Sequence, residues 1–149
     1  MGFQDEARFG RVCDPKRCWS PPGVRPVVKK QIVREYSYAY GVVYPKTGGL
    51  DSVILPDMRG DTMEVFLKQI SKQHPNDYIL FMDGAPCHST KKLKIPRNIE
   101  IVKLPPYSPQ LNPAENVWHE MREKWFGNLV FSSLDAVISR MCNGFSEIK

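Results

Sequence analysis

The stretch Asp77-Tyr-Ile-Leu-Phe-Met-Asp83-Gly84 holds a near-continuous apolar run, Tyr78 to Met82, that ends in a carboxylate and a glycine. A short apolar run bounded by turn residues predicts a strand covered on both faces, as in a parallel sheet. Asp83 then stands at the carboxyl end of that strand, where α/β proteins tend to bind ligands. A charge at this position needs a partner, so Asp83 is the first candidate functional residue.

Three further parts of the chain predict strands around this run. Ile99 to Leu104 predicts a strand parallel to Tyr78–Met82. Ser37 to Tyr44 is rich in aromatic and β-branched residues and is followed, after a turn with two glycines, by Leu50 to Leu55, which predicts a β-hairpin. The short apolar start Met1 to Phe3 predicts the tail of an N-terminal strand. The predicted sheet therefore mixes antiparallel and parallel strands.

Apolar residues at helical spacing predict three helices. The first covers 61–73 and opens with an Asp61-x-x-Glu capping box. The second covers 113–126, with Asn112 at its N-cap and a proline at its first position. The third begins near Ser132 or Ser133. Strand, hairpin, helix, two strands and two helices in this order predict an α/β domain.

Composition limits the class of protein. A length of 149 residues, with 42% apolar and 25% charged residues, fits one globular domain and excludes a disordered or fibrous chain. The apolar runs are too short to cross a bilayer, and the charged start does not resemble a signal peptide, so we expect neither membrane insertion nor secretion. Cysteines at irregular spacing indicate reduced thiols, and Cys13 and Cys18 with Cys87-His88 lack the spacing of a structural zinc site.

Positive charge is concentrated near the N-terminus. The chain has a net charge of +5, and residues 1–34 carry all of that excess. A second basic group, which includes Lys91 and Lys92, follows the Tyr78–Met82 run. Such segments attract polyanions, most often nucleic acid, but they also serve as solvated surfaces. Charge alone leaves both interpretations open.

Three acidic residues stand where they could converge. Asp83 ends its strand, Asp5 follows the N-terminal apolar start, and Glu115 lies in the first turn of its helix. If the strands of Asp5 and Asp83 are neighbours, all three carboxylates can meet. Oxygen ligands of this kind suit Mg²⁺ or Mn²⁺, and two such ions can activate a water and stabilise charge during phosphodiester cleavage. The alternatives are a helix cap, a strand-ending turn and a surface charge.

Four segments resemble the mariner-type DDE transposases, particularly their bacterial insertion-sequence relatives. The segments occur in the order found in the family and span almost the whole chain, and the last is the most specific. They are Gln4-Asp-Glu-Ala-Arg-Phe-Gly10, Trp19-Ser-Pro-Pro-Gly-Val-Arg-Pro26, Phe81-Met-Asp-Gly-Ala-Pro-Cys-His88 and Leu104-Pro-Pro-Tyr-Ser-Pro-Gln-Leu-Asn-Pro-Ala-Glu-Asn-Val-Trp118.

The resemblance implies a ribonuclease H-like fold with a mixed five-stranded sheet and flanking helices, as a single catalytic domain over residues 1–149. It makes Asp5, Asp83 and Glu115 the acidic triad that holds two Mg²⁺, with Mn²⁺ as a substitute and no small-molecule cofactor. His88 matches a histidine common in the family, which would position water or contact a phosphate near the metals; the alternative is a loop histidine satisfied by hydrogen bonds. Asn112 is expected to be an auxiliary residue near the site. The implied activity is metal-dependent DNA cleavage and strand transfer at transposon ends.

The chain also departs from the family pattern. The spacing from Asp83 to Glu115 is slightly short, which a loop absorbs at little cost, and Gly84 replaces an asparagine that is usual there. Full-length relatives begin with helix-turn-helix DNA-binding domains, which we expect to be absent here, with the first strand clipped. Two alternatives follow: a decayed remnant that only binds DNA or pairs with a full-length transposase, and a ribonuclease H-like structure-selective nuclease.

The resemblance and the charge pattern together predict the partners. Double-stranded DNA, as transposon ends and target, is the expected partner, a homodimer is allowed for, and the expected location is the cytoplasm of a bacterium, at the nucleoid. Trp19 and its neighbouring prolines predict a β-ribbon that touches DNA; the alternative is a loop pinned into its own core by Trp19. The residues expected to meet DNA phosphates are Lys16, Arg17, Arg25, Lys29, Lys30, Lys91 and Lys92.

Overall fold

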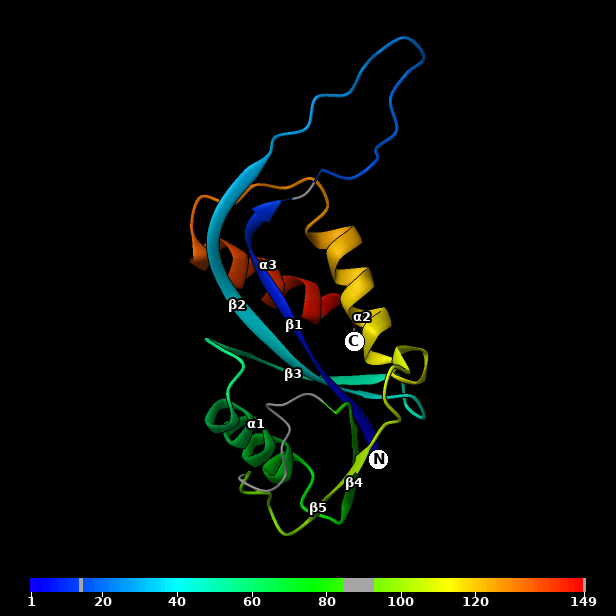
Figure 1. The fold of residues 1–149 in the computed structure, drawn as a ribbon, viewed down its shortest axis with the longest axis vertical. Helices are drawn as coiled ribbons and strands as arrows, with labels where there is room; N and C mark the ends of the chain where they lie inside the picture. Colours follow the sequence, from blue (N-terminus) through cyan, green and yellow to red (C-terminus); the bar gives the residue numbers. More distant parts are fainter. Residues whose placement is uncertain (14, 85–92, 149) are drawn as a thin grey trace.

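A computed structural model describes residues 1–13, 15–84 and 93–148 of the chain. Its sheet has five strands in the order β3-β2-β1-β4-β5 (Figure 1). β1 pairs antiparallel with β2, which pairs antiparallel with β3, whereas β1, β4 and β5 run parallel. The strands are β1 (Gly2–Cys13), β2 (Gln31–Tyr44), β3 (Gly49–Leu55), β4 (Tyr78–Met82) and β5 (Ile99–Lys103).

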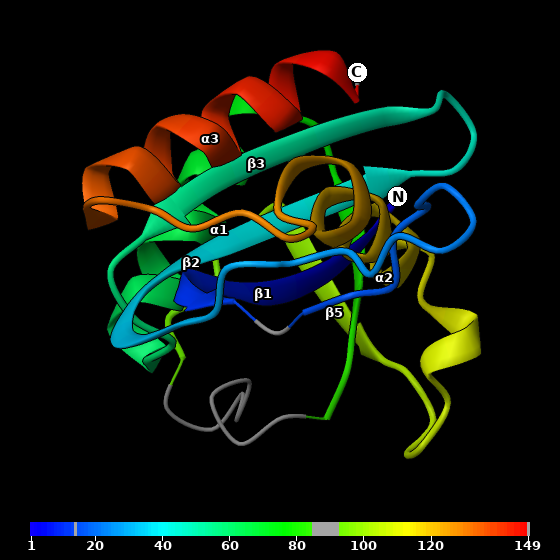
Figure 2. The same ribbon diagram turned by 90° about the horizontal axis from the view of Figure 1, so that it is seen from above.

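Helices cover both faces of this sheet (Figures 1 and 2). One apolar core joins α1 to the sheet through residues such as Tyr40, Phe66 and Leu80. A second core joins α2 and α3 to the other face through residues such as Phe9 and Trp118. The helical segments are α1 (Gly60–Gln73), a 3-10 turn (Pro109–Leu111), α2 (Ala114–Glu120), a π-helical segment (Met121–Trp125) and α3 (Leu134–Glu147).

The predicted order of elements, the mixed sheet and the buried helix stripes are confirmed. Two strands are longer than predicted: β1 continues to Cys13, so Asp5 is an interior residue of the strand and not its tail, and β2 begins at Gln31. The two extensions pair with each other as far as Cys13 and Gln31. Because that pairing is a tertiary contact, the short apolar start alone could not predict it.

The second predicted helix changes form along its length. α2 ends at Glu120, and Met121–Trp125 is π-helical, where one continuous α-helix was expected. Its apolar stripe is buried against the sheet as predicted. α3 begins as predicted, because the Ser133 side chain accepts a hydrogen bond from the N–H of Ala136.

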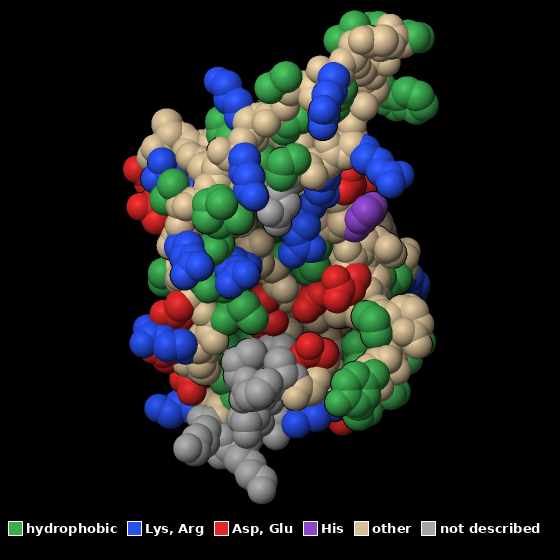
Figure 3. All heavy atoms as spheres, turned by 45° about the horizontal axis from the view of Figure 1, so that its top comes forward, with side chains coloured by type: hydrophobic (Ala, Val, Ile, Leu, Met, Phe, Trp, Pro, Cys, Tyr) green, Lys and Arg blue, Asp and Glu red, His purple; other side chains and the backbone are tan. Residues whose placement is uncertain are grey.

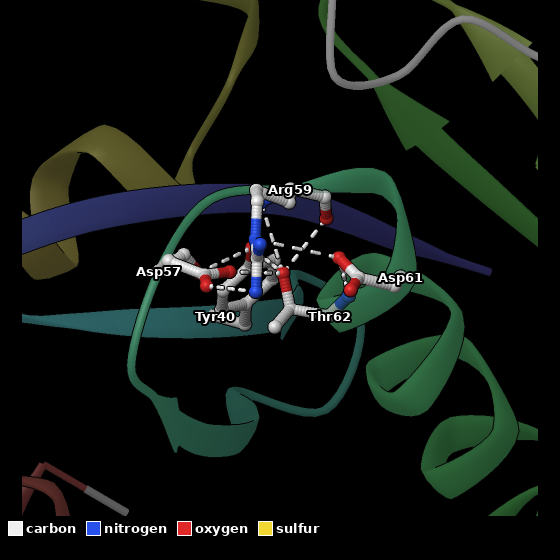
Figure 4. A network of polar contacts seen from close by, with 5 residues as sticks. All are labelled: Tyr40, Asp57, Arg59, Asp61 and Thr62. Atoms are coloured by element: carbon white, nitrogen blue, oxygen red, sulfur yellow. Dashed lines mark hydrogen bonds and ion pairs between the residues drawn. The ribbon is translucent and has the colours of Figure 1, made fainter.

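The predicted cap of α1 was wrong in detail. The N-cap is Arg59, whose N–H donates to Thr62 Oγ1 at 2.9 Å, so Asp61 is not the cap (Figure 4). Thr62 Oγ1 also lies 2.9 Å from a carboxylate oxygen of Asp57 and 3.2 Å from the hydroxyl of Tyr40. Arg59 forms ion pairs with Asp57 and Asp61. This network ties the start of α1 to β2.

Thr62→Ala should lower the free energy of unfolding by about 1–2 kcal/mol, because it removes the acceptor of the N-cap N–H of Arg59 and leaves the Tyr40 hydroxyl with one partner fewer. Urea unfolding measures this change. Thr47→Ala is the matched control, since the Thr47 hydroxyl lies in an exposed turn and makes only long contacts, of 3.4 and 3.5 Å. An equal effect of the two substitutions would contradict the role given to the network.

Residues 15–30 form a long excursion between β1 and β2 that stands away from the body of the domain (Figure 1). The excursion contains a turn but no strand, so the predicted β-ribbon is wrong. Trp19 is fully exposed, which rules out the alternative that it pins the loop into the core. Proline-rich sequence explains the irregular backbone, because proline has no N–H to donate to a strand ladder. We call residues 15–30 the arm.

Two side-chain amides hold the roots of the arm. Asn128 accepts from the backbone N–H of Lys16 at 2.7 Å and donates to its carbonyl at 3.2 Å. Gln31 donates to the carbonyl of Phe131 at 2.8 Å and accepts from its N–H at 2.9 Å. Each amide replaces a pair of backbone hydrogen bonds, so the arm leaves the domain in a defined direction.

No helix within the described part of the chain is long and apolar enough to cross a membrane. Cys13, Cys18 and Cys142 are free thiols, in agreement with the expectation of reduced cysteines. Cys87 and His88, the second half of the zinc alternative, lie outside the described residues.

Candidate active site

The parallel pairing of β1 with β4 brings two of the predicted acids side by side, at the point where β4 ends. Phe3 pairs with Phe81, and their rings stack with centroids 4.9 Å apart. Asp5 and Asp83 each stand two residues beyond this pair, so they are level with each other. The strands that lead to Asp5 and Asp83 are therefore neighbours, as the predicted convergence of the acids requires.

The third acid comes from α2. Glu115 lies in the first turn of that helix and, with Asp5 and Asp83, lines a pocket of about 370 Å³. Acidic side chains gather near the middle of one face, with Lys and Arg side chains grouped above them (Figure 3). The remaining described residues of the lining are Gly84, Leu104, Pro105, Pro106, Tyr107, Ser108, Pro109 and Asn112. We call this pocket the acidic pocket.

Asn112 joins the strand of one acid to the helix of another. Its Nδ2 donates to the backbone carbonyl of Gln4 at 3.3 Å, and its Oδ1 accepts from the N–H of Ala114 at 3.2 Å. Gln4 precedes Asp5 and Ala114 precedes Glu115, so the buried amide of Asn112 holds the two acids in register. The predicted N-cap is off by one residue, because α2 begins at Ala114 with Pro113 at its N-cap, although Asn112 does accept a hydrogen bond from the first helical N–H.

A tryptophan adds a second link between the same two elements. The indole Nε1 of Trp118 on α2 donates to Oδ2 of Asp5 at 3.0 Å, and the backbone N–H of Glu6 donates to Oδ1 at 2.9 Å. Both oxygens of the Asp5 carboxylate are therefore oriented by donors. Trp118 was predicted as core, and its buried ring agrees with that, but nothing in the spacing indicated a partner for its N–H.

The carboxyl of Asp5 takes up a proton far more readily than usual. Burial raises its pKa, and the nearby carboxylate of Glu115 raises it further, to about 7. The hydrogen bonds from Glu6 and Trp118 act in the opposite direction and are outweighed. A bound cation would favour the ionised form of this carboxyl.

The chemistry of these donors fits Mg²⁺ or Mn²⁺. Carboxylate oxygens are the ligands that such hard cations prefer, and neither histidine nor cysteine is among the described lining residues. Within residues 1–13, 15–84 and 93–148, no three His, Cys, Asp or Glu side chains lie close enough to enclose an ion. The acids thus share a pocket without forming a closed ligand set.

A second, polar groove of about 510 Å³ continues from the acidic pocket and shares Glu115, Asn112 and Pro109 with it. It is also lined by Lys16, Gln110, Asn116, His119 and Arg122. We call it the basic groove. His119 and Arg122 follow Glu115 at i+4 and i+7, so one side of the helical segment presents an acid and then two basic groups. That spacing is the signal in the sequence from which the basic groove could be predicted.

The predicted DNA-binding residues fall into three groups. Arg17, Arg25, Lys29 and Lys30 lie exposed on the arm. Lys16 lies at the root of the arm, forms an ion pair with Glu123 and lines the basic groove. Lys91 and Lys92, like the auxiliary His88, lie outside the described residues.

Solved structures share this fold. The chain superposes on a Mos1 mariner paired-end complex with Mn with a TM-score of 0.72 and 17% identity, covering 97% of this chain and 47% of that one. A Mos1 paired-end complex with Mg gives a TM-score of 0.65 and 18% identity over 98% and 48% of the two chains. The predicted ribonuclease H-like fold is confirmed, and the chain spans about half the length of these transposase chains.

Sequence comparison assigns the family. The uncharacterized protein y4pE/y4sA of Sinorhizobium fredii (strain NBRC 101917 / NGR234) is 35% identical over 115 residues, which are 76% of this chain and 85% of that protein. Residues 1–138 match the model of the DDE superfamily endonucleases, a stretch that contains Asp5, Asp83 and Glu115. On the strength of that match across nearly the whole chain, this protein belongs to the DDE superfamily endonuclease family.

Proposed function

We propose that this chain is a transposase catalytic domain that cleaves DNA at transposon ends and transfers the freed strand to target DNA. The observation that carries the proposal is the convergence of Asp5, Asp83 and Glu115 from three distant parts of the chain on one pocket. Membership of an endonuclease family and the Mos1 fold, which that transposase shows in complexes with transposon-end DNA, support it.

Asp5, Asp83 and Glu115 would hold two divalent ions in this proposal, with Asp5 and Asp83 sharing one and Glu115 completing the second. When bound, Mg²⁺ or Mn²⁺ lowers the pKa of a water and stabilises charge on the reacting phosphate and the leaving oxygen. Mg²⁺ keeps several waters and takes phosphate oxygens from its substrate, so a closed cage of protein ligands is not needed.

The protein contributes orientation and charge to the reaction. Asn112 ties the backbone beside Asp5 to the backbone beside Glu115, and Trp118 orients the Asp5 carboxylate. Oriented ligands lower the reorganisation needed at the reaction. The water attacks a phosphodiester at the transposon end, and the freed 3′ hydroxyl then attacks target DNA, so no covalent protein intermediate is needed.

The basic groove gives the DNA a path away from the acids. Lys16, His119 and Arg122 line it, and it meets the acidic pocket at Glu115. Basic side chains in a groove that adjoins the acidic pocket suit the phosphates that flank the one being cleaved. The exposed cations of the arm would extend this contact along the duplex.

The function is tested with duplexes that carry the terminal repeat of the element, incubated with Mg²⁺, Mn²⁺ or EDTA. Nicking at the repeat end followed by joining to a second duplex supports the proposal. Nicking of branched DNA without joining would instead indicate a structure-selective nuclease. Binding without nicking under any metal would indicate a remnant. Sedimentation of the DNA complex tests the homodimer, which stays a prediction.

Binding to DNA by this chain should be nearly indifferent to sequence, because Lys and Arg on an irregular arm contact phosphates, which carry no base information. Labelled duplex with the terminal repeat is bound at fixed salt and challenged with unlabelled repeat or scrambled duplex of equal length. A preference for the repeat above about tenfold, or 1.4 kcal/mol, would show that this domain reads sequence itself.

Replacing Lys29 and Lys30 with alanine should make the log–log salt dependence of DNA binding shallower by about 2, because each phosphate contact releases close to one counterion. Affinity is measured from low to moderate salt. The matched control replaces Lys68 and Lys72, which are exposed on α1 and outside the arm and groove. Equal slopes for both double variants would remove the arm from the DNA interface.

A further inference from the structure

Trp118 packs against Gly41 and donates a hydrogen bond to the carboxylate of Asp5. Glycine at position 41 is opposite Asp5 in the pairing of β1 with β2. A Cβ atom built there would lie 2.8 Å from Cη2 and 3.2 Å from Cζ2 of Trp118. The missing side chain of Gly41 therefore leaves the notch into which the six-membered part of the indole fits.

The notch determines where the indole N–H points. With its far edge seated against Gly41, the buried ring of Trp118 directs Nε1 to Oδ2 of Asp5 at 3.0 Å. Trp118 is also three residues after Glu115, one turn along the same helix. One side chain thus sets the orientation of the Asp5 carboxylate and the distance between β1 and the helix that carries Glu115.

We propose that Trp118, seated by Gly41, is a positioning residue that orients the Asp5 carboxylate for a divalent ion. The inference rests on the proposed function, because it concerns the same acids. Hydrogen bonds from outside a metal's own ligands fix ligand orientation, and their loss typically lowers metal affinity about 10–100-fold. Burial and the two hydrogen bonds, from the Glu6 N–H and the Trp118 indole, restrict the orientation of the Asp5 carboxylate.

The metal-free protein tests the contact first. In a ¹⁵N-labelled sample, the Trp118 indole signal is assigned by its absence from Trp118→Phe. Asp5→Ala should shift that signal upfield and speed its exchange with solvent, while the indole signals of Trp19 and Trp125 stay in place. Unchanged Trp118 shift and exchange in Asp5→Ala would overturn the inference whether or not the protein binds a metal.

Calorimetric titration with Mn²⁺ tests the consequence. Trp118→Phe keeps most of the ring but loses the N–H, and it should weaken Mn²⁺ binding about tenfold or more. Gly41→Ala, which displaces the ring, should act in the same direction. The matched control is Trp125→Phe, since Trp125 is not among the described residues that line the acidic pocket. Normal affinity in Trp118→Phe would overturn the inference and leave the proposed function standing.

The same titration separates the two proposals. If wild type and Asp83→Asn both fail to bind Mn²⁺, the proposed function fails, and with it the role of Trp118 toward a metal. If wild type binds and only Trp118→Phe and Gly41→Ala are weakened, with Trp125→Phe normal, both proposals are supported. Circular dichroism of every variant confirms that the comparison is made between folded proteins.

Discussion

Asp83→Asn should lower Mg²⁺-dependent nicking by about a thousandfold or more, which corresponds to roughly 4 kcal/mol of transition-state stabilisation. The change keeps the size of the side chain but removes an anionic ligand at the edge of the acidic pocket, where Asp83 is level with Asp5. Mn²⁺ should support at least as much activity in the wild type as Mg²⁺, and EDTA should abolish it. Initial rates on a repeat-end duplex measure the effect.

The control is Glu100→Gln, which neutralises an exposed carboxylate on the neighbouring strand β5 and should leave the rate unchanged. In metal-free buffer, Asp83→Asn should unfold at the same temperature as the wild type or slightly higher, because it removes one negative charge from a pocket that two other acids line. Nicking by Asp83→Asn at the wild-type rate would contradict the catalytic assignment. Lost activity together with a much lower melting temperature would contradict it as well, since misfolding would then explain the loss.

The strands and helices with strong local signals were predictable from sequence. The run Tyr78–Met82 is β4 with the predicted bounds, but the predicted cover on both faces was wrong, because alternate residues are buried and Ile79 is exposed. The stripe that includes Phe66 and Ile70 is buried on α1 as its spacing requires. These elements are specified by residues that lie close together in the sequence, and a periodic pattern of apolar residues can be recognised over that range.

The parts that the sequence did not predict depend on distant contacts. Residues 4–13 of β1 mix apolar and charged side chains, and a register irregularity between Gly10 and Val12 breaks their alternation. The arm has hydrophobic residues that resemble core positions, yet Trp19 is fully exposed. The length of β1 and the position of the arm both depend on the pairing of β1 with β2, the two strands that the arm connects. No local sequence pattern predicts that pairing.

The candidate site shows the same division. The three acids could be chosen because Asp83 follows the end of an apolar run, Glu115 lies in the first turn of a predicted helix, and all three stand in motifs that resemble a family. The hydrogen bond from the Trp118 indole to Asp5 could not be predicted from the sequence. It depends on the strand register that places Gly41 beside Asp5, and on a helix more than a hundred residues away from Asp5 along the chain. Contacts of this kind join residues that are far apart in the sequence, so no local pattern predicts which residues will meet.

Asp5 should make the metal-free protein less stable as the pH rises toward neutrality. Its pKa is about 7 in the folded protein, against an ordinary value of 3.8, so between these values the folded state holds a proton that the unfolded state has lost. Stability from this group is fully present below pH 3.8 and is lost as the pH rises through 7. The shift corresponds to at most about 4 kcal/mol, at roughly 1.4 kcal/mol per pH unit.

Urea unfolding in EDTA at several pH values between 4 and 8.5 measures this loss, with Asp5→Asn as the decisive variant. The neutral amide cannot ionise, so the variant should approach wild-type stability near pH 4 and exceed it by a few kcal/mol at pH 8. Asp77→Asn removes an exposed carboxylate and serves as the control, with the same pH dependence as the wild type. Parallel pH profiles for Asp5→Asn and the wild type would contradict the raised pKa.

Mg²⁺ should compete with the proton on the Asp5 carboxyl. A cation binds the ionised form of Asp5, so its binding at pH 6 must release a proton that is already gone at pH 8.5, and its affinity should rise with pH over this range. The stabilisation by Mg²⁺ should therefore be larger at pH 8.5 than at pH 6, which opposes the trend of the metal-free protein. Asp5→Asn should abolish both trends at once, because a single carboxyl beside Glu115 produces the metal-free instability and the pH-dependent metal affinity.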